Sequence, residues 1–154
     1  QGTTFSLYFP VCCDVAGQSP RALETSIPRG SERILLVDDE ENVLGLLKEM
    51  SEYLGYRVTA VSDSTEAEVL FRTRPDDFDL VVTDQTMPGL TGIVLAQKIF
   101  TLKPKMPIII CTGFSEALSE EKAKEIGFAG YILKPVMIGD FARVVRRALE
   151  GGVG

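Results

Sequence analysis

Five short apolar runs recur along the chain, and each alternates with a longer stretch of helical periodicity. The runs are Arg33–Val37, Tyr56–Val61, Phe78–Thr83, Pro107–Cys111 and Gly130–Leu133. Strands that are apolar along most of their length are typical of a parallel sheet that helices cover on both faces. Because crossovers in such sheets are right-handed, the pattern predicts a doubly wound α/β fold with five parallel strands.

The helical stretches carry their own end signals. Apolar residues recur at helical spacing from Val43 to Leu54, and Gly55 follows as a predicted C-cap. A fourth helix is predicted to start at Ser115, as N-cap, and to end at Gly127.

The region before the first apolar run has a different character. Periodicity disappears over residues 12–31, where proline and glycine interrupt a polar stretch, so we interpret this segment as a linker. The globular domain is predicted to cover residues 32–154. Residues 1–11 alternate between polar and apolar side chains until Pro10, as a half-buried strand does.

Composition excludes several classes of function. The chain contains no histidine, which excludes Ser-His-Asp and Cys-His catalysis and imidazole zinc sites within it. The net charge of −6 argues against nucleic acid as a direct partner. The three cysteines show no disulfide framework, and no signal peptide or membrane-spanning run is evident, so we expect a cytoplasmic chain with reduced thiols.

Reactive side chains follow four of the five predicted strands. Asp38 and Asp39 follow the first, Asp84 the third, Thr112 the fourth and Lys134 the fifth. The second strand contributes nothing comparable, as a flavodoxin-like strand order of 2-1-3-4-5 requires, because strand two then lies at the edge. The carboxyl ends of the central strands would thus bring three acids to one rim of the sheet.

These residue types permit phosphoryl chemistry. Asp38 and Asp39 supply hard oxygen ligands for Mg2+, and Asp84 can act as a carboxylate nucleophile. Lys134 would neutralise phosphoryl oxygens, and the Thr112 hydroxyl can donate to one. Each residue also has a plain structural interpretation: Asp38 and Asp39 as helix caps, Thr112 as a turn residue, Lys134 as a solvated charge.

In four segments the chain resembles the receiver domain of two-component response regulators. The segments are Ile34–Glu40, Asp79–Gly89, Pro107–Gly113 and Gly130–Pro135, in the family's order. The resemblance implies Asp84 as the phosphoacceptor and Asp38 and Asp39 as the acidic metal pair.

The resemblance also implies roles that the residues alone do not suggest. The backbone carbonyl of Thr86 would complete the Mg2+ shell, Thr112 and Tyr131 would form a switch pair, and Lys134 would contact the phosphoryl group. The Lys134–Pro135 bond is expected to be cis. The implied function is to accept phosphate on Asp84 from a phosphohistidine. Because this chain has no histidine, that phosphohistidine must lie outside it, on a histidine kinase or a histidine phosphotransfer domain.

Residues 2–10 are similar to the last glycine box and closing strand of a histidine-kinase ATP-binding domain. Residues 1–11 are therefore interpreted as a remnant of that domain, and the chain as the C-terminal receiver of a hybrid sensor kinase, whose parent could be membrane-anchored.

Two other functions remain open at this point. One is an aspartate-nucleophile phosphohydrolase acting on small phosphate esters, although Thr86 stands where such enzymes carry a second acid. The other is a flavin carrier, which the acids after the first strand disfavour because they would repel the FMN phosphate.

Overall fold

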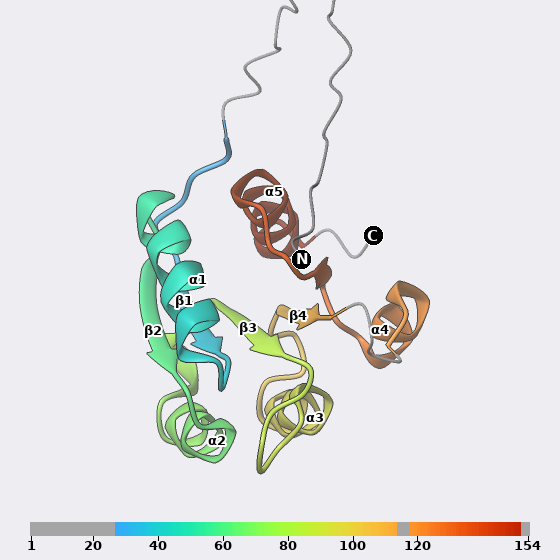
Figure 1. Cartoon of the computed structure of the whole chain (residues 1–154). Helices are drawn as coiled ribbons and strands as arrows, with labels where there is room; N and C mark the ends of the chain where they lie inside the picture. The colour runs from blue at the N-terminus through green and yellow to red at the C-terminus, as the bar shows by residue number, and fades with distance from the viewer. Residues whose placement is uncertain (1–26, 114–117, 152–154) are drawn as a thin grey trace, which may run out of the picture.

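The computed structural model describes residues 27–113 and 118–151. Strands and helices alternate along this part of the chain, with one short 3-10 helix, η1, before the third strand (Figure 1). The elements are β1 (Arg33–Val37), α1 (Glu41–Tyr53), β2 (Arg57–Val61), α2 (Ser64–Thr73), η1 (Pro75–Asp77), β3 (Leu80–Asp84), α3 (Gly92–Leu102), β4 (Ile108–Thr112), α4 (Glu120–Ile126), β5 (Gly130–Leu133) and α5 (Ile138–Leu149).

The five strands form one parallel sheet in the order β2-β1-β3-β4-β5, which confirms the predicted flavodoxin-like topology. β1 pairs with both β2 and β3, so that Leu35 lies between Thr59 and Val81. The strand order reverses after β1, because β2 lies on one side of β1 and β3 on the other. Functional sites of such folds lie at the carboxyl ends of the strands beside this topological switch point. β1 and β3 are therefore the strands on which a site is expected.

Helices cover both faces of the sheet (Figure 1). On one face Ile34 and Leu36 of β1 pack in a cluster with residues of α1 and α5. On the other face Leu35 and Val37 pack in a cluster with residues of α2, α3 and α4. Strand side chains alternate between faces, and both faces of β1 are buried, so a continuous apolar run is what the layered arrangement requires.

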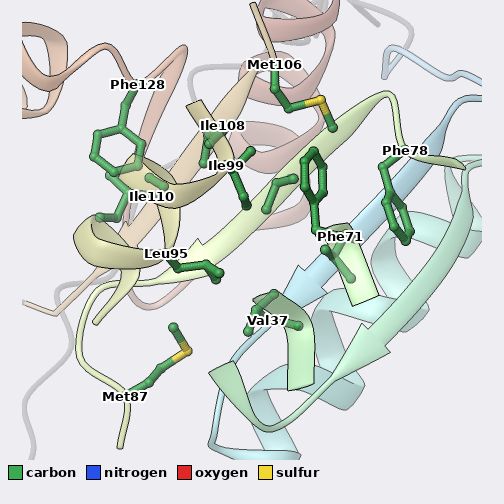
Figure 2. Packing of buried hydrophobic residues seen from close by; sticks show 14 of the residues in the cluster. Val37, Phe71, Phe78, Met87, Leu95, Ile99, Met106, Ile108, Ile110 and Phe128 are labelled. Carbon is green, nitrogen blue, oxygen red and sulfur yellow. The ribbon is translucent and has the colours of Figure 1, made fainter. Parts of the chain in front are cut away.

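The cluster beneath α2 and α3 contains three buried phenylalanines, Phe71, Phe78 and Phe128. Phe71 of α2 and Phe78 are stacked, with ring centroids 6.0 Å apart. Figure 2 shows them beside the apolar side chains of β4 and α3, with Met87 extending into the same cluster from the loop after β3. The loop that follows Asp84 is thus anchored in the core.

Helix ends follow the expected chemistry, with one correction. The Asp63 side chain caps α2 by accepting hydrogen bonds from two backbone amides, and Gly127 ends α4 with a φ of +104°. The prediction that Ser115 caps the fourth helix is wrong: α4 begins at Glu120, and the Ser119 hydroxyl is its cap. Ser115 itself lies outside the described residues.

The segment immediately before β1 packs against the C-terminal end of α1. The Gly30 amide donates to the Leu54 carbonyl at 3.1 Å, and the Arg29 guanidinium lies 5.0 Å from the centre of the Tyr53 ring. Glu32 then pairs with Arg146 of α5 at 2.8 Å. Glu32 and Leu149, the last residue of α5, line the same surface depression, so both ends of the domain lie at the amino-terminal rim of the sheet.

Residues 1–11 and most of the predicted linker lie outside the described residues, so their interpretation stays a prediction. Among the helices of the described part of the chain, none combines the length and the apolar character that crossing a membrane requires.

Candidate functional site

Two carboxylates and one ammonium group meet at the carboxyl ends of the central strands. Asp84 is the last residue of β3 and Asp38 directly follows β1; they are 5% and 1% exposed. The Lys134 Nζ atom lies 2.9 Å from Oδ2 of Asp38 and 2.5 Å from Oδ1 of Asp84. The structure therefore brings together three of the residues that the sequence predicted, from three separate strand ends.

Backbone hydrogen bonds fix the orientation of each carboxylate. The second oxygen of Asp38, Oδ1, accepts from the Glu40 amide at 3.0 Å, where the chain turns into α1. Oδ2 of Asp84 accepts from the Thr86 amide at 2.7 Å. All four carboxylate oxygens thus have a partner, which offsets part of the cost of burying them.

Lys134 is placed by β5 and the turn after it. Its backbone amide donates to the Thr112 carbonyl at 2.8 Å, which continues the β4–β5 pairing by one residue. The Lys134–Pro135 peptide bond is cis, as the family resemblance implies. The side chain extends from this turn across the ends of β4 and β3 to reach Asp38.

Burial and the ion pairs perturb the ionisation of Asp38 and Lys134. Desolvation raises the pKa of Asp38 above its ordinary value, although the hydrogen bond from Lys134 works in the opposite direction. Burial opposes the charge on Lys134, but the bonds to Asp84 and Asp38 outweigh it and raise its pKa. Two acids thus share one cation in a desolvated pocket, and this leaves a net negative charge.

Asp39 and Thr86 do not join the buried group. Both are exposed, and no group of three or more Asp, Glu, Cys or His side chains within residues 27–113 and 118–151 is arranged to hold a metal ion. The donor set nevertheless suits Mg2+, which commonly uses one or two carboxylates, keeps several waters and accepts backbone carbonyls. Asp38 and Asp84 already hold a cation, the Lys134 ammonium, between them.

The predicted switch residues lie on the two strands beyond β3, Thr112 on β4 and Tyr131 on β5. Thr112, the last residue of β4, is fully buried, and its hydroxyl donates to the Gly113 carbonyl at 3.3 Å. Tyr131 pairs in register with Ile110 and is half-buried. Its hydroxyl donates to the Leu118 carbonyl at 3.2 Å, so it ties β5 to the segment before α4.

Three contacts at the site were not foreseen from the sequence: the amides of Glu40 and Thr86, and the carbonyl of Leu118. All are backbone groups, which every residue type carries, so no side-chain pattern could have marked them. Only the local path of the chain, a turn into α1 or a loop after β3, aims them at the site.

The arrangement suits phosphoryl transfer to a carboxylate. A nucleophilic oxygen, a lysine ammonium and hard oxygen donors for a divalent cation lie at one rim, and positioning and charge neutralisation are most of what that reaction needs.

Comparison with known proteins gives consistent matches. A family model for the response regulator receiver domain matches residues 34–146. The two-component response regulator ARR14 of Arabidopsis thaliana is 35% identical over 104 residues, which are 68% of this chain and 27% of that protein. Sporulation initiation phosphotransferase F of Bacillus subtilis is 28% identical over 120 residues, 77% of this chain and 94% of that protein.

Solved structures match the same region. A response regulator receiver domain protein from Clostridium thermocellum has a TM-score of 0.74 and 32% identity, and the match covers 78% of this chain and 95% of that one. The chain spans only about a fifth to a quarter of several regulators that it matches, 19%, 27% and 25% of the first three.

Proposed function

Because this chain belongs to the response regulator receiver domain family, we propose that it is a phosphoacceptor module of a two-component phosphorelay, with Asp84 as the acceptor. The observation that carries this assignment is the buried Asp38–Lys134–Asp84 group. Of its two acids, Asp84 ends the central strand β3, and its side chain is held at one oxygen by Lys134 and at the other by the Thr86 amide.

The proposed reaction moves a phosphoryl group from a phosphohistidine to this carboxylate. An oxygen of Asp84 forms a bond to phosphorus as the bond from phosphorus to the imidazole nitrogen breaks, and the leaving imidazole takes up a proton from solvent. Lys134 keeps its charge throughout and shifts its contact from the carboxylate to a phosphoryl oxygen. The donor is a histidine kinase or histidine phosphotransfer domain, which this chain would meet in the cytoplasm.

We assign the cofactor as Mg2+, which Asp38, Asp39, Asp84 and the carbonyl of Thr86 would hold. Asp38 and Asp84 are already adjacent, whereas Asp39 and the carbonyl of Thr86 would contribute from exposed positions at the same rim. When bound, the metal supplies the charge that neutralises the phosphoryl oxygens, which one lysine shared by two acids cannot do alone.

Thr112 and Tyr131 are proposed to transmit the change. The added phosphate carries a charge of about −2. The Thr112 hydroxyl would leave the Gly113 carbonyl for a phosphate oxygen, and Tyr131, now bound to the Leu118 carbonyl, would respond by changing position. Both contacts involve the region between β4 and α4, so the surface of α4, β5 and α5 would report the phosphorylated state to a partner.

We further propose that residues 32–154 are the receiver of a hybrid sensor kinase, joined by the linker of residues 12–31 to a remnant, residues 1–11, of the kinase ATP-binding domain. This proposal rests on the sequence pattern of the first eleven residues. The phosphohydrolase alternative is disfavoured because Thr86 occupies the position of the second acid such enzymes use.

The test is labelling of the protein by a small phosphodonor such as acetyl phosphate, read by intact-protein mass spectrometry. Wild type should gain one phosphoryl group in the presence of Mg2+ and none in EDTA, and Asp84→Asn should gain none. Asp79→Asn is the matched control, because Asp79 lies before the opposite end of the same strand and should leave labelling intact. Labelling that persists in Asp84→Asn rejects the assignment, and turnover of p-nitrophenyl phosphate by wild type would favour the phosphohydrolase.

A further inference from the structure

One side chain outside the acidic group joins helix α2 to the loop that follows Asp84. Ser64, the first residue of α2, is 1% exposed. Its hydroxyl donates to the Pro88 carbonyl at 2.8 Å and accepts from the Leu90 amide at 2.9 Å. The hydroxyl thus acts as both donor and acceptor toward the same loop, and its two partners are two residues apart.

The loop approaches α2 too closely for most side chains. Gly89, between the two bonded residues, has a φ of +81°, and a Cβ atom there would lie 3.1 Å from Oγ1 of Thr65 and 3.3 Å from Oγ of Ser64. The glycine supplies the left-handed backbone that lets Pro88 and Leu90 face the same hydroxyl. The tip of the loop therefore packs closely against Ser64 and is hydrogen-bonded to it.

Other attachments fix the base of this loop and its core-facing residue, so the Ser64 contact holds the part of the loop beyond Met87. At its base the Gly92 amide donates to the Gln85 carbonyl at 2.9 Å, and a Cβ on Gly92 would lie 2.1 Å from the carbonyl oxygen of Asp84. Met87 is buried in the core (Figure 2). Thr86 lies between these fixed points, exposed at the rim.

We propose that Ser64 is a positioning residue for the metal site: by fixing the tip of the loop, it holds the Thr86 carbonyl and the Thr86 amide in place at Asp84. This inference rests on the proposed function, because it takes the Thr86 carbonyl as a ligand of Mg2+. Outer groups that orient ligands are a general feature of metal sites, and their loss lowers metal affinity without removing a ligand.

The test measures Mg2+ affinity directly, by isothermal titration calorimetry on the unphosphorylated protein. In Ser64→Ala the dissociation constant for Mg2+ should rise about tenfold, the lower end of what loss of an outer hydrogen bond costs. Ser51→Ala is the matched control: Ser51 is also a buried helix serine, whose hydroxyl donates to the Leu47 carbonyl at 2.7 Å in α1. It should lower the melting temperature and leave Mg2+ affinity unchanged.

A second measurement needs no variant and so cannot fail through misfolding. The Leu90 amide reports the contact, because its hydrogen is bound to Ser64. Coupling is reciprocal, so Mg2+ added to wild type should slow hydrogen exchange at Leu90.

Two results would overturn the inference while the proposed function stands: Mg2+ binding to Ser64→Ala with wild-type affinity, or exchange at Leu90 that Mg2+ does not change. A wild-type protein that binds no Mg2+ at all would instead remove the metal from the proposed function itself, and the inference with it.

Discussion

Replacing Lys134 by methionine should destabilise the domain in a way that depends on both pH and Mg2+. The substitution keeps much of the side-chain volume and removes the only ammonium group shown at Asp38 and Asp84 in the described part of the chain. What remains is two buried carboxylates with no cation between them.

The magnitude follows from the geometry. Both carboxylates touch the same nitrogen, at 2.9 and 2.5 Å, so their oxygens are close neighbours. Two unit charges about 5 Å apart repel by about 3 kcal/mol at an effective dielectric of about 20. Breaking a buried ion pair by removing one partner costs about 3 to 5 kcal/mol in measured cases. We therefore expect Lys134→Met to lose about 3 to 5 kcal/mol of unfolding free energy at neutral pH without Mg2+.

The pH dependence has a definite sign. Burial raises the pKa of Asp38. An acid whose pKa is raised in the folded state contributes its full stabilisation at a pH below its ordinary pKa. That stabilisation is lost as the pH rises through the pKa it has in the folded protein. Removing the ammonium raises that folded pKa further, so the deficit of Lys134→Met should shrink as the pH falls from about 7.5 towards 5.

The assay is urea unfolding followed by circular dichroism, because the chain has no tryptophan. Lys134→Met and wild type are compared at both ends of this pH range, with and without Mg2+ at about 10 mM, which should recover part of the loss by binding the acids. Lys48→Met, at an exposed lysine 3.9 Å from Glu52, should stay within about 0.5 kcal/mol of wild type. A Lys134→Met protein as stable as wild type, or one whose deficit neither Mg2+ nor acid reduces, would refute the reasoning.

Three further predictions concern the rest of the domain. The hydrogen bond from Arg33 lowers the pKa of Asp79, so this ion pair should stabilise the folded domain above the ordinary aspartate pKa and stop doing so in stronger acid. In urea unfolding, Asp79→Asn should lower the unfolding free energy by about 1 kcal/mol at neutral pH, and its stability should approach that of wild type in acid. Burial raises the pKa of Cys111 to about 12, so iodoacetamide should not modify it in the folded protein but should modify it in urea. Peptide-level mass spectrometry measures this, and rapid labelling of the folded protein would contradict it. Phe71 is fully buried and stacked, so Phe71→Ala should lower the unfolding free energy by about 3 to 5 kcal/mol in the same urea assay, and a loss under about 1 kcal/mol would show that the cluster repacks.

Much of the fold could be predicted because hydrophobic periodicity reports burial directly. All five strands formed within a few residues of the predicted runs, in the predicted order. The strand ends were predicted less closely: Asp84 and Thr112 were placed at or just beyond their strands and are in fact the last strand residues. Strand ends are set by backbone pairing with neighbours, which side-chain hydrophobicity does not encode.

The misplaced start of α4 has a similar cause. Ser115 and Ser119 are both serines followed by glutamate, and either can cap a helix. The structure uses Ser119, whose hydroxyl accepts from the Lys122 amide. Leu118, directly before this cap, is buried against the sheet face that carries Ile110, and that tertiary contact is invisible to a local pattern.

At the site, the sequence identified the residue types but not their partners. Strand-end positions brought Asp38, Asp84 and Lys134 together as predicted. Asp39 was grouped with them because it follows the same strand and because the family resemblance pairs it with Asp38. It is nevertheless exposed, since successive residues leaving a strand point in different directions. The contacts of Ser64 were not predicted, since they are made with a loop more than twenty residues away along the chain.

The segment before β1 and the last turn of α5 lie at the rim of the sheet farthest from Asp84. A domain fused to either end would therefore be attached about one strand length, or roughly 17 Å, from the Asp84 carboxylate, on the opposite side of the sheet. Such an attachment would leave the Asp84 side of the sheet open to the proposed phosphodonor. Recombination can then place the same unit beside unrelated neighbours without rebuilding its chemistry.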